Sequence, residues 1–393
     1  MGLSQFLRAA PPVAAGWLEE AVFVDGDDWH DAALAAIAAA RSAVTVETYA
    51  LHGDAVGTSL VAALAAAAAR GCTVHLLVDG VGSASWVRAA DGGPDAVASG
   101  VEVRVWNPLP WTIVRRAGIG RAFSFLTRIN RRDHRKLCLV DGRTAWLGSI
   151  NWVAAHSRRS QGDTAWHDIG ARVEGPGVAA LEAAVTQAWR RAWPLVGGRV
   201  RPRWLAGPAA PRTACASVRL NHTFRLRRAA YHDLLARLRA ARERIWIANA
   251  YVVPRGSLLR TLGAAARRGV DVRVLVPAVS DHAFMPWLTA VFSDALAGAG
   301  VRVWAYRPRM LHAKTMLIDD LALVGSHNLN SRSFFHDLEV EAVLSQPASV
   351  ARLAEIYRDD LSLSDPLLPP ALARLRWWQR LGARAALLAK SWL

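Results

Sequence analysis

Short apolar runs alternate with longer Ala- and Leu-rich stretches along the chain, and the same order occurs twice. In the first half, an apolar run within residues 40–50 is followed by an Ala-rich stretch that stops at Gly71 and by a second apolar run that ends at Gly80. Residues 241–251 and 258–277 repeat this order, with Gly269 in the place of Gly71. Short apolar runs are typical of buried strands, and longer stretches ended by glycine are typical of helices. This alternation predicts an α/β fold with a layered sheet in each half.

The two similar units meet in a stretch that has no clear periodicity. Residues 193–217 are rich in Gly, Pro and Arg, which is typical of a linker. A chain of 393 residues also has the length of two ordinary domains. We therefore expect an N-terminal domain at residues 1–200 and a C-terminal domain at residues 201–393.

The repeat carries a polar motif in matching positions. Each copy has His-x-Lys, then four residues and Asp, and ends in Gly-Ser-x-Asn. The first copy consists of His134, Lys136, Asp141, Gly148, Ser149 and Asn151, and the second of His312, Lys314, Asp319, Gly325, Ser326 and Asn328. His-x-Lys alone occurs by chance in many chains. Two complete copies in corresponding places of a repeat predict one functional site to which both halves contribute. We expect the His, Lys and Asp of each copy to be its catalytic residues.

These residue types suit phosphoryl chemistry. Residues two apart on a strand point the same way, so each His and Lys would share a face, with Asp at the strand's end. One imidazole can attack phosphorus, and the other can protonate the leaving alkoxide and later deprotonate the incoming alcohol. The lysines would hold the phosphoryl oxygens, together with Ser149, Asn151, Ser326 and Asn328. We expect no cofactor and no metal, because two lysines beside the imidazoles would repel a cation.

The paired motifs resemble those of the phospholipase D superfamily, and more closely those of its bacterial cardiolipin synthases of the short type without transmembrane helices. The resemblance extends over residues 23–357 and includes the segments INRRDHRK, NAYVVP, MLHAK and GSHNLNSRSF. It implies a duplicated fold of two mixed-sheet domains related by a pseudo-twofold axis, with a shared active site and a phosphohistidine intermediate. Two departures are Gly148-Ser149, where these synthases often have Gly-Gly, and Asn330, where Asp is common.

The same resemblance implies residues outside the motifs. Asp168 in the segment WHD and Glu339 in FFHDLEV match positions that orient a catalytic imidazole, where a carboxylate on the far ring nitrogen fixes the tautomer. Ordinary strand residues are the alternative for three weaker matches, which are Glu47, Tyr49 and Tyr251. The sequence does not distinguish the nucleophile. The family more often uses the N-terminal histidine, which favours His134.

Charge and aromatic residues indicate the kind of partner. The net charge of +16 favours anionic lipid or nucleic acid. Arginines are interleaved with Trp, Phe and Leu in residues 107–133 and 372–393, which is typical of interfacial helices and favours lipid over nucleic acid. The alternatives are a buried connection with a basic edge for the first segment and a tail packed on its own domain for the second.

The expected location is the cytoplasmic face of the cell membrane, with peripheral attachment. The longest Ala-rich stretch is too short to span a bilayer, and no secretory signal is visible. The three cysteines show no pairing pattern, which favours a reducing compartment, and Cys138 in an apolar run is expected to be buried. The oligomeric state stays open.

The resemblance implies transfer of a phosphatidyl group, with phosphatidylglycerol as donor and acceptor and cardiolipin as product. Hydrolysis to phosphatidic acid is the same chemistry with water as the acceptor. Two further alternatives remain open. One is a metal-independent phosphodiesterase or nuclease, and the other is a catalytically silent module that binds anionic membranes.

Overall fold

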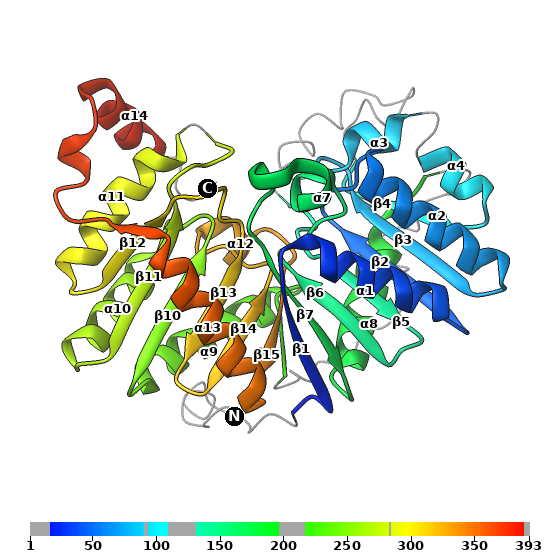
Figure 1. Ribbon diagram of the computed structural model, residues 1–393, viewed down its shortest axis with the longest axis horizontal. Helices are drawn as coiled ribbons and strands as arrows, with labels where there is room; N and C mark the ends of the chain where they lie inside the picture. Colours follow the sequence, from blue (N-terminus) through cyan, green and yellow to red (C-terminus); the bar gives the residue numbers. More distant parts are fainter. Residues whose placement is uncertain (1–15, 90–92, 109–130, 196–216, 283, 389–393) are drawn as a thin grey trace.

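The chain folds into two similar halves that stand side by side, each built on an eight-stranded mixed sheet flanked by helices (Figure 1). The computed structural model describes residues 16–89, 93–108, 131–195, 217–282 and 284–388. The predicted α/β class and the duplication about a pseudo-twofold axis are confirmed. The domain boundary near residue 200 stays a prediction, because it lies outside the described residues, as does most of the basic segment 107–133.

The first sheet has the strand order β1-β7-β6-β5-β2-β3-β4-β8. Its strands are β1 (Glu19–Val24), β2 (Ala43–Thr48), β3 (Thr73–Asp79), β4 (Glu102–Trp106), β5 (Leu137–Val140), β6 (Thr144–Gly148), β7 (Ile169–Glu174) and β8 (Trp193–Pro194). The helices of this half are α1 (Gly26–Ala39), α2 (Ala55–Ala69), α3 (Ala84–Arg88), α4 (Gly93–Ala98), α7 (Arg158–Gln161) and α8 (Val178–Arg191), with 3-10 turns η3 (Ala154–His156) and η4 (Gly162–Thr164).

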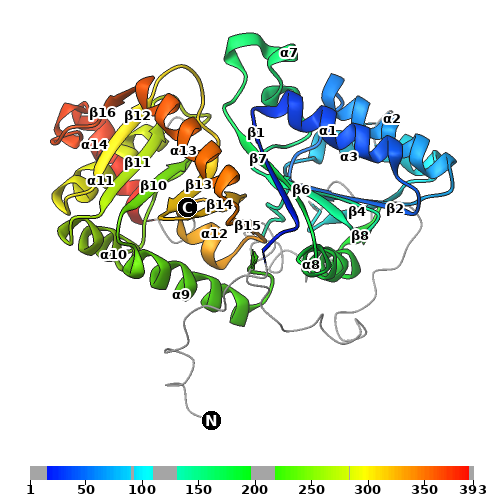
Figure 2. The ribbon, with the colours of Figure 1, turned by 60° about the horizontal axis from the view of Figure 1, so that its bottom comes forward.

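The second sheet has the order β16-β12-β11-β10-β13-β14-β15-β9. Its strands are β9 (Val218–Leu220), β10 (Arg244–Asn249), β11 (Asp271–Pro277), β12 (Arg302–Tyr306), β13 (Lys314–Ile318), β14 (Leu321–Gly325), β15 (Val340–Leu344) and β16 (Ser364–Pro366). The helices of this half are α9 (Phe224–Ala240), α10 (Gly256–Arg267), α11 (Met285–Gly298), α12 (Ser331–Phe335), α13 (Pro347–Ser362) and α14 (Trp377–Leu388), with the 3-10 turn η6 (Leu372–Arg374). Figure 2 shows α8 and α9 on the opposite face of the sheets from α1 and α13.

The predicted strand–helix–strand repeat forms the centre of each sheet. β2 pairs in parallel with β3 and antiparallel with β5, and β10 pairs in the same way with β11 and β13. Gly71 and Gly269 end the intervening helices with φ of 92° and 91°, a conformation that glycine adopts without a steric penalty. Cys138 is fully buried in the core of the first half, as predicted.

One apolar core crosses from one half to the other. It combines side chains of β6 and β7, such as Leu147 and Ala171, with side chains of β14 and β15, such as Val324 and Val340. Trp17 adds a bond across the junction, since its indole N–H donates to the main-chain oxygen of Val343 at 3.1 Å. The halves therefore share buried apolar surface, and the residues beside the junction are fixed relative to each other.

The C-terminal helix α14 packs against α11. The rings of Trp378 and Trp287 meet edge to face with centroids 5.4 Å apart. No helix among the described residues is both long enough and apolar enough to cross a bilayer.

Candidate active site

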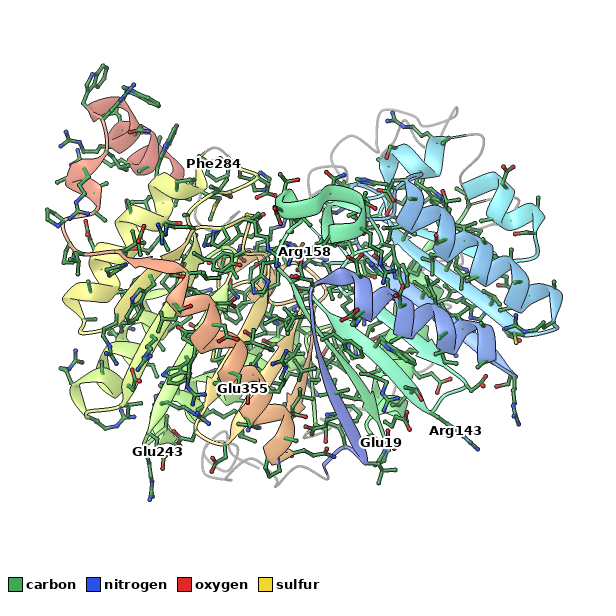
Figure 3. The ribbon with its side chains drawn as sticks, viewed as in Figure 1. Glu19, Arg143, Arg158, Glu243, Phe284 and Glu355 are labelled. Carbon is green, nitrogen blue, oxygen red and sulfur yellow. The ribbon has the colours of Figure 1, made fainter. Side chains whose placement is uncertain are left out.

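The His-x-Lys parts of both motifs lie at the carboxyl ends of the central parallel strands. β5 and β13 run antiparallel to β2 and β10, so residues at the start of β5 and β13 lie where β2 and β10 end. His134 precedes β5, and His312 precedes β13. Figure 3 labels Arg143 and Glu243 at the lower edge of the molecule, where β5 has ended and β10 begins, so the histidines lie toward the opposite edge.

The two halves hold each other's motif through reciprocal main-chain bonds. The N–H of His134 donates to the oxygen of Leu338 at 3.0 Å, and the N–H of Leu338 donates to the oxygen of Arg132 at 2.9 Å. In the other direction, the oxygen of His167 accepts the N–H of His312 at 2.8 Å. Asp168 follows His167 in the chain, and Glu339 follows Leu338. Each bridge therefore delivers a carboxylate of one half to the histidine of the other.

Each motif imidazole is oriented by that carboxylate. Nδ1 of His312 lies 2.7 Å from Oδ1 of Asp168. Nδ1 of His134 lies 3.1 Å from both carboxylate oxygens of Glu339 and 3.1 Å from the main-chain oxygen of Ser326. Because all these neighbours are acceptors, Nδ1 must carry the proton in both rings. The unprotonated nitrogen is then Nε2 in each, which is the form that a nucleophile or a general base requires.

The pKa shifts indicate that the two motifs face one site. Burial, followed by the positive charges of Lys136 and Lys314, lowers the pKa of His134 well below its usual value. Lys136 belongs to the first motif and Lys314 to the second, so both act on one imidazole. Burial also lowers the pKa of Lys136 to about 8 and that of Lys314 to about 7. An anion beside these lysines would raise both pKa values and favour their charged forms.

The two carboxylates differ in their electrostatics. Burial alone would raise the pKa of Asp168, but His156 and His312 reverse this effect and hold it well below its usual value. The pKa of Glu339 is raised instead, because burial outweighs the lowering by His327, Lys136 and its hydroxyl partners. Burial and Lys314 lower the pKa of His312 to about 3 in spite of the opposing charge of Asp168. The two halves of the site thus have similar geometry but differ in charge.

The lysines and the Gly-Ser-x-Asn residues make mostly internal bonds. Nζ of Lys136 donates to the main-chain oxygen of His134 at 2.6 Å, and Lys314 bonds to His312 in the same way. Ser326 donates to Glu339, whereas Ser149 donates to the oxygen of Ile169 at 3.1 Å. These serines therefore support the residues that carry the site.

The two asparagines differ. Oδ1 of Asn151 accepts the N–H of Ala50 at 3.1 Å, and its amide nitrogen lies 3.2 Å from Nε2 of His156. Oδ1 of Asn328 is buried without a hydrogen-bond partner among the described residues. Asn328 is therefore the member of the pair with an unused polar atom.

Asp141 and Asp319 lie apart from the imidazoles, at the far ends of β5 and β13. Asp141 accepts the N–H groups of Arg41, Ser42 and Ala43 at 3.0, 2.8 and 2.9 Å. Asp319 accepts the N–H groups of residues 242–244 at 2.9 to 3.1 Å. Each carboxylate thus holds the segment that leads into a central strand, from which we infer a structural role. The catalytic role expected from the sequence stays a prediction.

Comparison with known proteins identifies the family. The model described as "Cardiolipin synthase, PLD-like domain" matches residues 33–166 and 234–361, one segment in each half. The chain belongs to this family.

Similar proteins agree with this assignment. The cardiolipin synthase A of Pseudomonas entomophila is 29% identical over 384 residues, which cover 94% of this chain and 74% of the relative. The cardiolipin synthase of Listeria innocua is 28% identical, covering 92% of this chain and 72% of the relative. Among solved structures, the phosphatidylserine synthase of Haemophilus influenzae has a TM-score of 0.72 at 13% identity, covering 99% of both chains. The polyphosphate kinase of Porphyromonas gingivalis has a TM-score of 0.53 at 14% identity, covering 91% of this chain and 53% of that chain.

The weaker sequence matches have separate positions in this cardiolipin synthase-family chain. The ring of Tyr49 meets that of His134 with centroids 5.1 Å apart, and Nζ of Lys136 lies 5.2 Å from the same tyrosine ring. Glu47 instead forms a buried ion pair with Arg135 at 2.5 Å. The hydroxyl of Tyr251 donates to Asp281 at 2.6 Å. Of these three residues, Tyr49 is the one in contact with a motif histidine.

His156 is a site residue that the sequence reasoning missed. Its Nδ1 lies 2.6 Å from Oδ2 of Asp168, so Asp168 joins two imidazoles. The sequence contains a weak signal, because Ser333 stands at the same distance after Asn328 as His156 does after Asn151. Ser333 likewise bonds to the carboxylate of its half, Glu339. The signal could be found only by comparing the two halves after the motif.

His156, Asp168 and His312 also form a group with metal-ligand geometry among the described residues, with ligand atoms within 4.8 Å of one another. In this group, Nδ1 of each imidazole lies at hydrogen-bond distance from the carboxylate of Asp168. Protons accordingly fill the positions a cation would need, and Lys314 adds a positive charge beside His312. The donor set therefore fits a hydrogen-bonded triad better than a metal site.

Proposed function

We propose that this chain transfers a phosphatidyl group from one phosphatidylglycerol molecule to the hydroxyl of a second, releasing glycerol and forming cardiolipin. The reciprocal arrangement of the site carries the proposal: each motif histidine is oriented through Nδ1 by a carboxylate of the other half, and a lysine from each motif acts on His134. This is an arrangement for two imidazoles to work on one phosphodiester. The names of the similar cardiolipin synthases support the choice of lipid.

In the first step, Nε2 of His134 forms a bond to phosphorus while the bond between phosphorus and the glycerol oxygen breaks. The leaving oxygen takes a proton from Nε2 of His312. The negative phosphodiester, placed beside Lys136 and Lys314, raises the low pKa of His312 and so supplies the protonated form that this step requires. The lysines stabilise the charge that develops on the phosphoryl oxygens.

In the second step, the hydroxyl of another lipid enters where glycerol has left. Nε2 of His312 takes its proton, the new oxygen–phosphorus bond forms and the bond from phosphorus to His134 breaks, which returns the electron pair to Nε2. Water in place of the second lipid would give phosphatidic acid by the same steps. Each histidine ends the cycle as it began.

The unequal carboxylates support His134 as the nucleophile. Asp168, whose pKa is held well below the usual value, stays ionised and would stabilise a positive charge on His312. Glu339, whose pKa is raised, gives His134 less of this stabilisation. A proton carrier needs the charged form and a nucleophile needs the neutral form, so His312 suits acid–base work and His134 suits attack.

Such a reaction places the protein at a membrane surface, and the net charge of +16 favours the anionic cytoplasmic leaflet. Attachment would be peripheral, through side chains on the surface. We propose one chain as the functional unit, because both motifs of the site come from the same chain.

The test is lipid analysis after the purified protein is incubated with phosphatidylglycerol vesicles in excess chelator. We expect cardiolipin and glycerol in equal amounts, and no product with His134→Ala. His75→Ala is the control, because His75 lies on β3 beside Glu102, away from both motifs. If phosphatidic acid were the only lipid product, the reaction would be hydrolysis and the proposed transfer would be wrong. Untouched lipid together with cleaved DNA would replace this proposal with the phosphodiesterase alternative.

A trapping experiment assigns the nucleophile. Labelled phosphatidylglycerol is mixed with His312→Ala or His134→Ala, the reaction is stopped in alkali, and the protein is analysed by mass spectrometry. We expect a phosphatidyl adduct on His134 in His312→Ala and none in His134→Ala. An adduct on His312 would reverse the two roles.

A further inference from the structure

The helix α14 presents an exposed apolar strip that the rest of the described chain leaves uncovered. Trp377 is 72% exposed and Leu381 is 61% exposed, and Trp378, whose ring also meets Trp287, is 42% exposed. Trp377 and Leu381 are four residues apart, so they lie on one side of the helix. Arg380 and Arg384 are exposed on the same helix. We call this surface, made of Trp377, Trp378, Leu381, Arg380 and Arg384, the α14 face.

The opposite side of α14 is fixed to the domain. Gly382 lies so close to Trp287 that a Cβ there would come within 2.7 Å of the ring, and Ala383 is fully buried. Just before the helix, Asp294 of α11 accepts the N–H groups of Ala371 and Leu372 at 2.7 and 2.9 Å. Because this side of α14 is packed against the domain, Trp377 on the other side points away from it.

The α14 face lies at the same end of the molecule as the active site. Figure 1 shows α14 at the upper edge, and the residues that mark the opposite ends of β5 and β10, Arg143 and Glu243, lie at the lower edge in Figure 3. Val279, which follows the carboxyl end of β11, adds a side chain that is 59% exposed. Aromatic and aliphatic side chains are thus available near the end where the motif histidines lie.

We propose that the α14 face docks this end of the protein on an anionic lipid bilayer. Tryptophan and leucine favour the boundary between headgroups and acyl chains, and nearby arginines pair with anionic headgroups. Charge complementarity favours lipid here, because residues 366–388 contain four arginines and no aspartate or glutamate. The inference rests on the proposed function, since a substrate held in the bilayer must meet the motif histidines without leaving the membrane.

Binding is tested by flotation of the full chain with vesicles of phosphatidylglycerol and phosphatidylcholine, or of phosphatidylcholine alone. We expect binding only to the first, and at least about tenfold weaker binding by the double variant Trp377→Ser/Leu381→Ser. Arg380→Gln and Arg384→Gln should each weaken binding about fivefold at low salt and less at high salt. Thermal unfolding of each variant is compared with that of the parent, because exposed positions should leave it unchanged.

Leu18→Ser is the matched control. Leu18 is 75% exposed and precedes Glu19, which Figure 3 labels at the lower edge. The substitution therefore removes a leucine that is more exposed than Leu381 from the end opposite to the α14 face, and we expect unchanged vesicle binding. Equal loss of binding by this control and the double variant would overturn the proposal, as would unchanged binding by the double variant or equal binding to both kinds of vesicle.

Activity separates this proposal from the proposed function. The double variant should lose transfer on vesicles at least about tenfold and keep it on phosphatidylglycerol dispersed in detergent micelles, where docking is not needed. A parent protein that floats through α14 but leaves every lipid unchanged would retain the docking surface and overturn the proposed reaction. Equal rates of transfer on vesicles by the parent and the double variant would retain the proposed reaction and overturn the docking surface.

Discussion

The carboxylates that orient the two motif histidines differ in the side chains to which they bond. Asp168 bonds to the imidazole of His156 as well as to His312, whereas Glu339 bonds to the hydroxyls of Ser326 and Ser333. His156 and His312 hold the pKa of Asp168 well below its usual value, whereas the partners of Glu339 do not offset its burial, so the first half stabilises an ionised carboxylate more strongly than the second does. This difference between corresponding positions gives two chemically unequal imidazoles to a site built from repeated halves.

His156 is therefore expected to act as a positioning residue for His312. His156→Ser installs the residue that the second half has at this place and removes one charge-assisted hydrogen bond to Asp168. Such bonds contribute about 1.5–3 kcal/mol, which corresponds to a loss of roughly ten- to a hundredfold in kcat. KM should change little, because His156 has no contact with substrate in the proposed mechanism. Steady-state transfer on detergent-dispersed lipid measures both constants.

The conservative variant His156→Asn tests whether this bond is what matters. Its amide can donate to Asp168 from near the position of Nδ1, so we expect it to recover much of the activity that His156→Ser loses. His75→Ala serves as the distant histidine control. Full activity in His156→Ser would show that Asp168 holds His312 without help.

At the scale of elements, the glycine of each Gly-Ser-x-Asn sequence allows two strands to approach closely. A Cβ on Gly148 would come within 2.6 Å of the backbone of residues 169 and 170, and one on Gly325 within 2.2 Å of the oxygen of Val340. In each half, the strand that follows the carboxylate thus lies against the strand that ends in the motif. The close approach keeps Ser326 within reach of Glu339.

Gly325→Ala should therefore destabilise the fold by about 3 kcal/mol or more, because the clash is with backbone and cannot be relieved by a side-chain rotation. Denaturant unfolding measures this loss. Gly298→Ala is the control, since Gly298 ends α11 and a Cβ there would meet nothing within 4 Å. Equal stability of the two variants would mean that β14 and β15 separate easily.

The turn role inferred for Asp319 gives a prediction that separates stability from chemistry. Asp319→Asn removes the charge that favours three backbone N–H groups but tolerates the positive φ of 48° at this position. We expect a loss of about 1–2 kcal/mol in stability and an unchanged kcat per folded molecule. Asp320→Asn, at the exposed neighbour, is the control. A large fall in kcat at normal stability would restore the catalytic role expected from the sequence.

The sequence could predict these elements where the signal is local. Apolar runs and helix-ending glycines located β2, α2 and β3 and their counterparts β10, α10 and β11, and the paired motifs located β5 and β13. Short edge strands such as β8 and β16 have two and three residues, too few to produce a periodic pattern. The internal roles of Ser149 and Ser326 were missed for a different reason. A hydroxyl can donate equally well to a phosphate and to a backbone oxygen, so its partner depends on which group the fold places beside it.

At the scale of the whole molecule, the site depends on how the halves meet, which no local pattern encodes. The bond from His134 to Glu339 joins residues 205 positions apart. A buried ionic cluster at the junction is centred on His167, the residue before Asp168. Nδ1 of His167 lies 2.9 Å from Asp25 of the first half, and its Nε2 lies 2.9 Å from Asp360 of the second half. Arg309 bonds to Asp25, and the ring of Tyr306 stacks on His167 with centroids 5.2 Å apart.

His167 is expected to carry a positive charge that holds the halves together. Both ring nitrogens face carboxylates, so both must donate and the ring is an imidazolium. Burial alone would lower the pKa of His167, but Asp25 and Asp360 raise it from 6.5 to about 9. A difference of this size corresponds to about 3 kcal/mol. Because the folded pKa is the higher one, this stabilisation is complete below pH 6.5, declines between pH 6.5 and 9 and is absent above that range.

Asp360→Asn should remove much of this pH dependence. Thermal unfolding is measured at several values between pH 6 and pH 9.5, and the difference in Tm between parent and variant is followed. We expect the difference to be largest near pH 6 and to shrink as the pH rises through the folded pKa, while Asp359→Asn, at an exposed neighbour, leaves the parent profile unchanged. Since the oxygen of His167 accepts the N–H of His312, transfer activity should fall in the same pH range as stability. A constant difference in Tm across the range would mean that His167 is neutral and that the apolar core alone joins the halves.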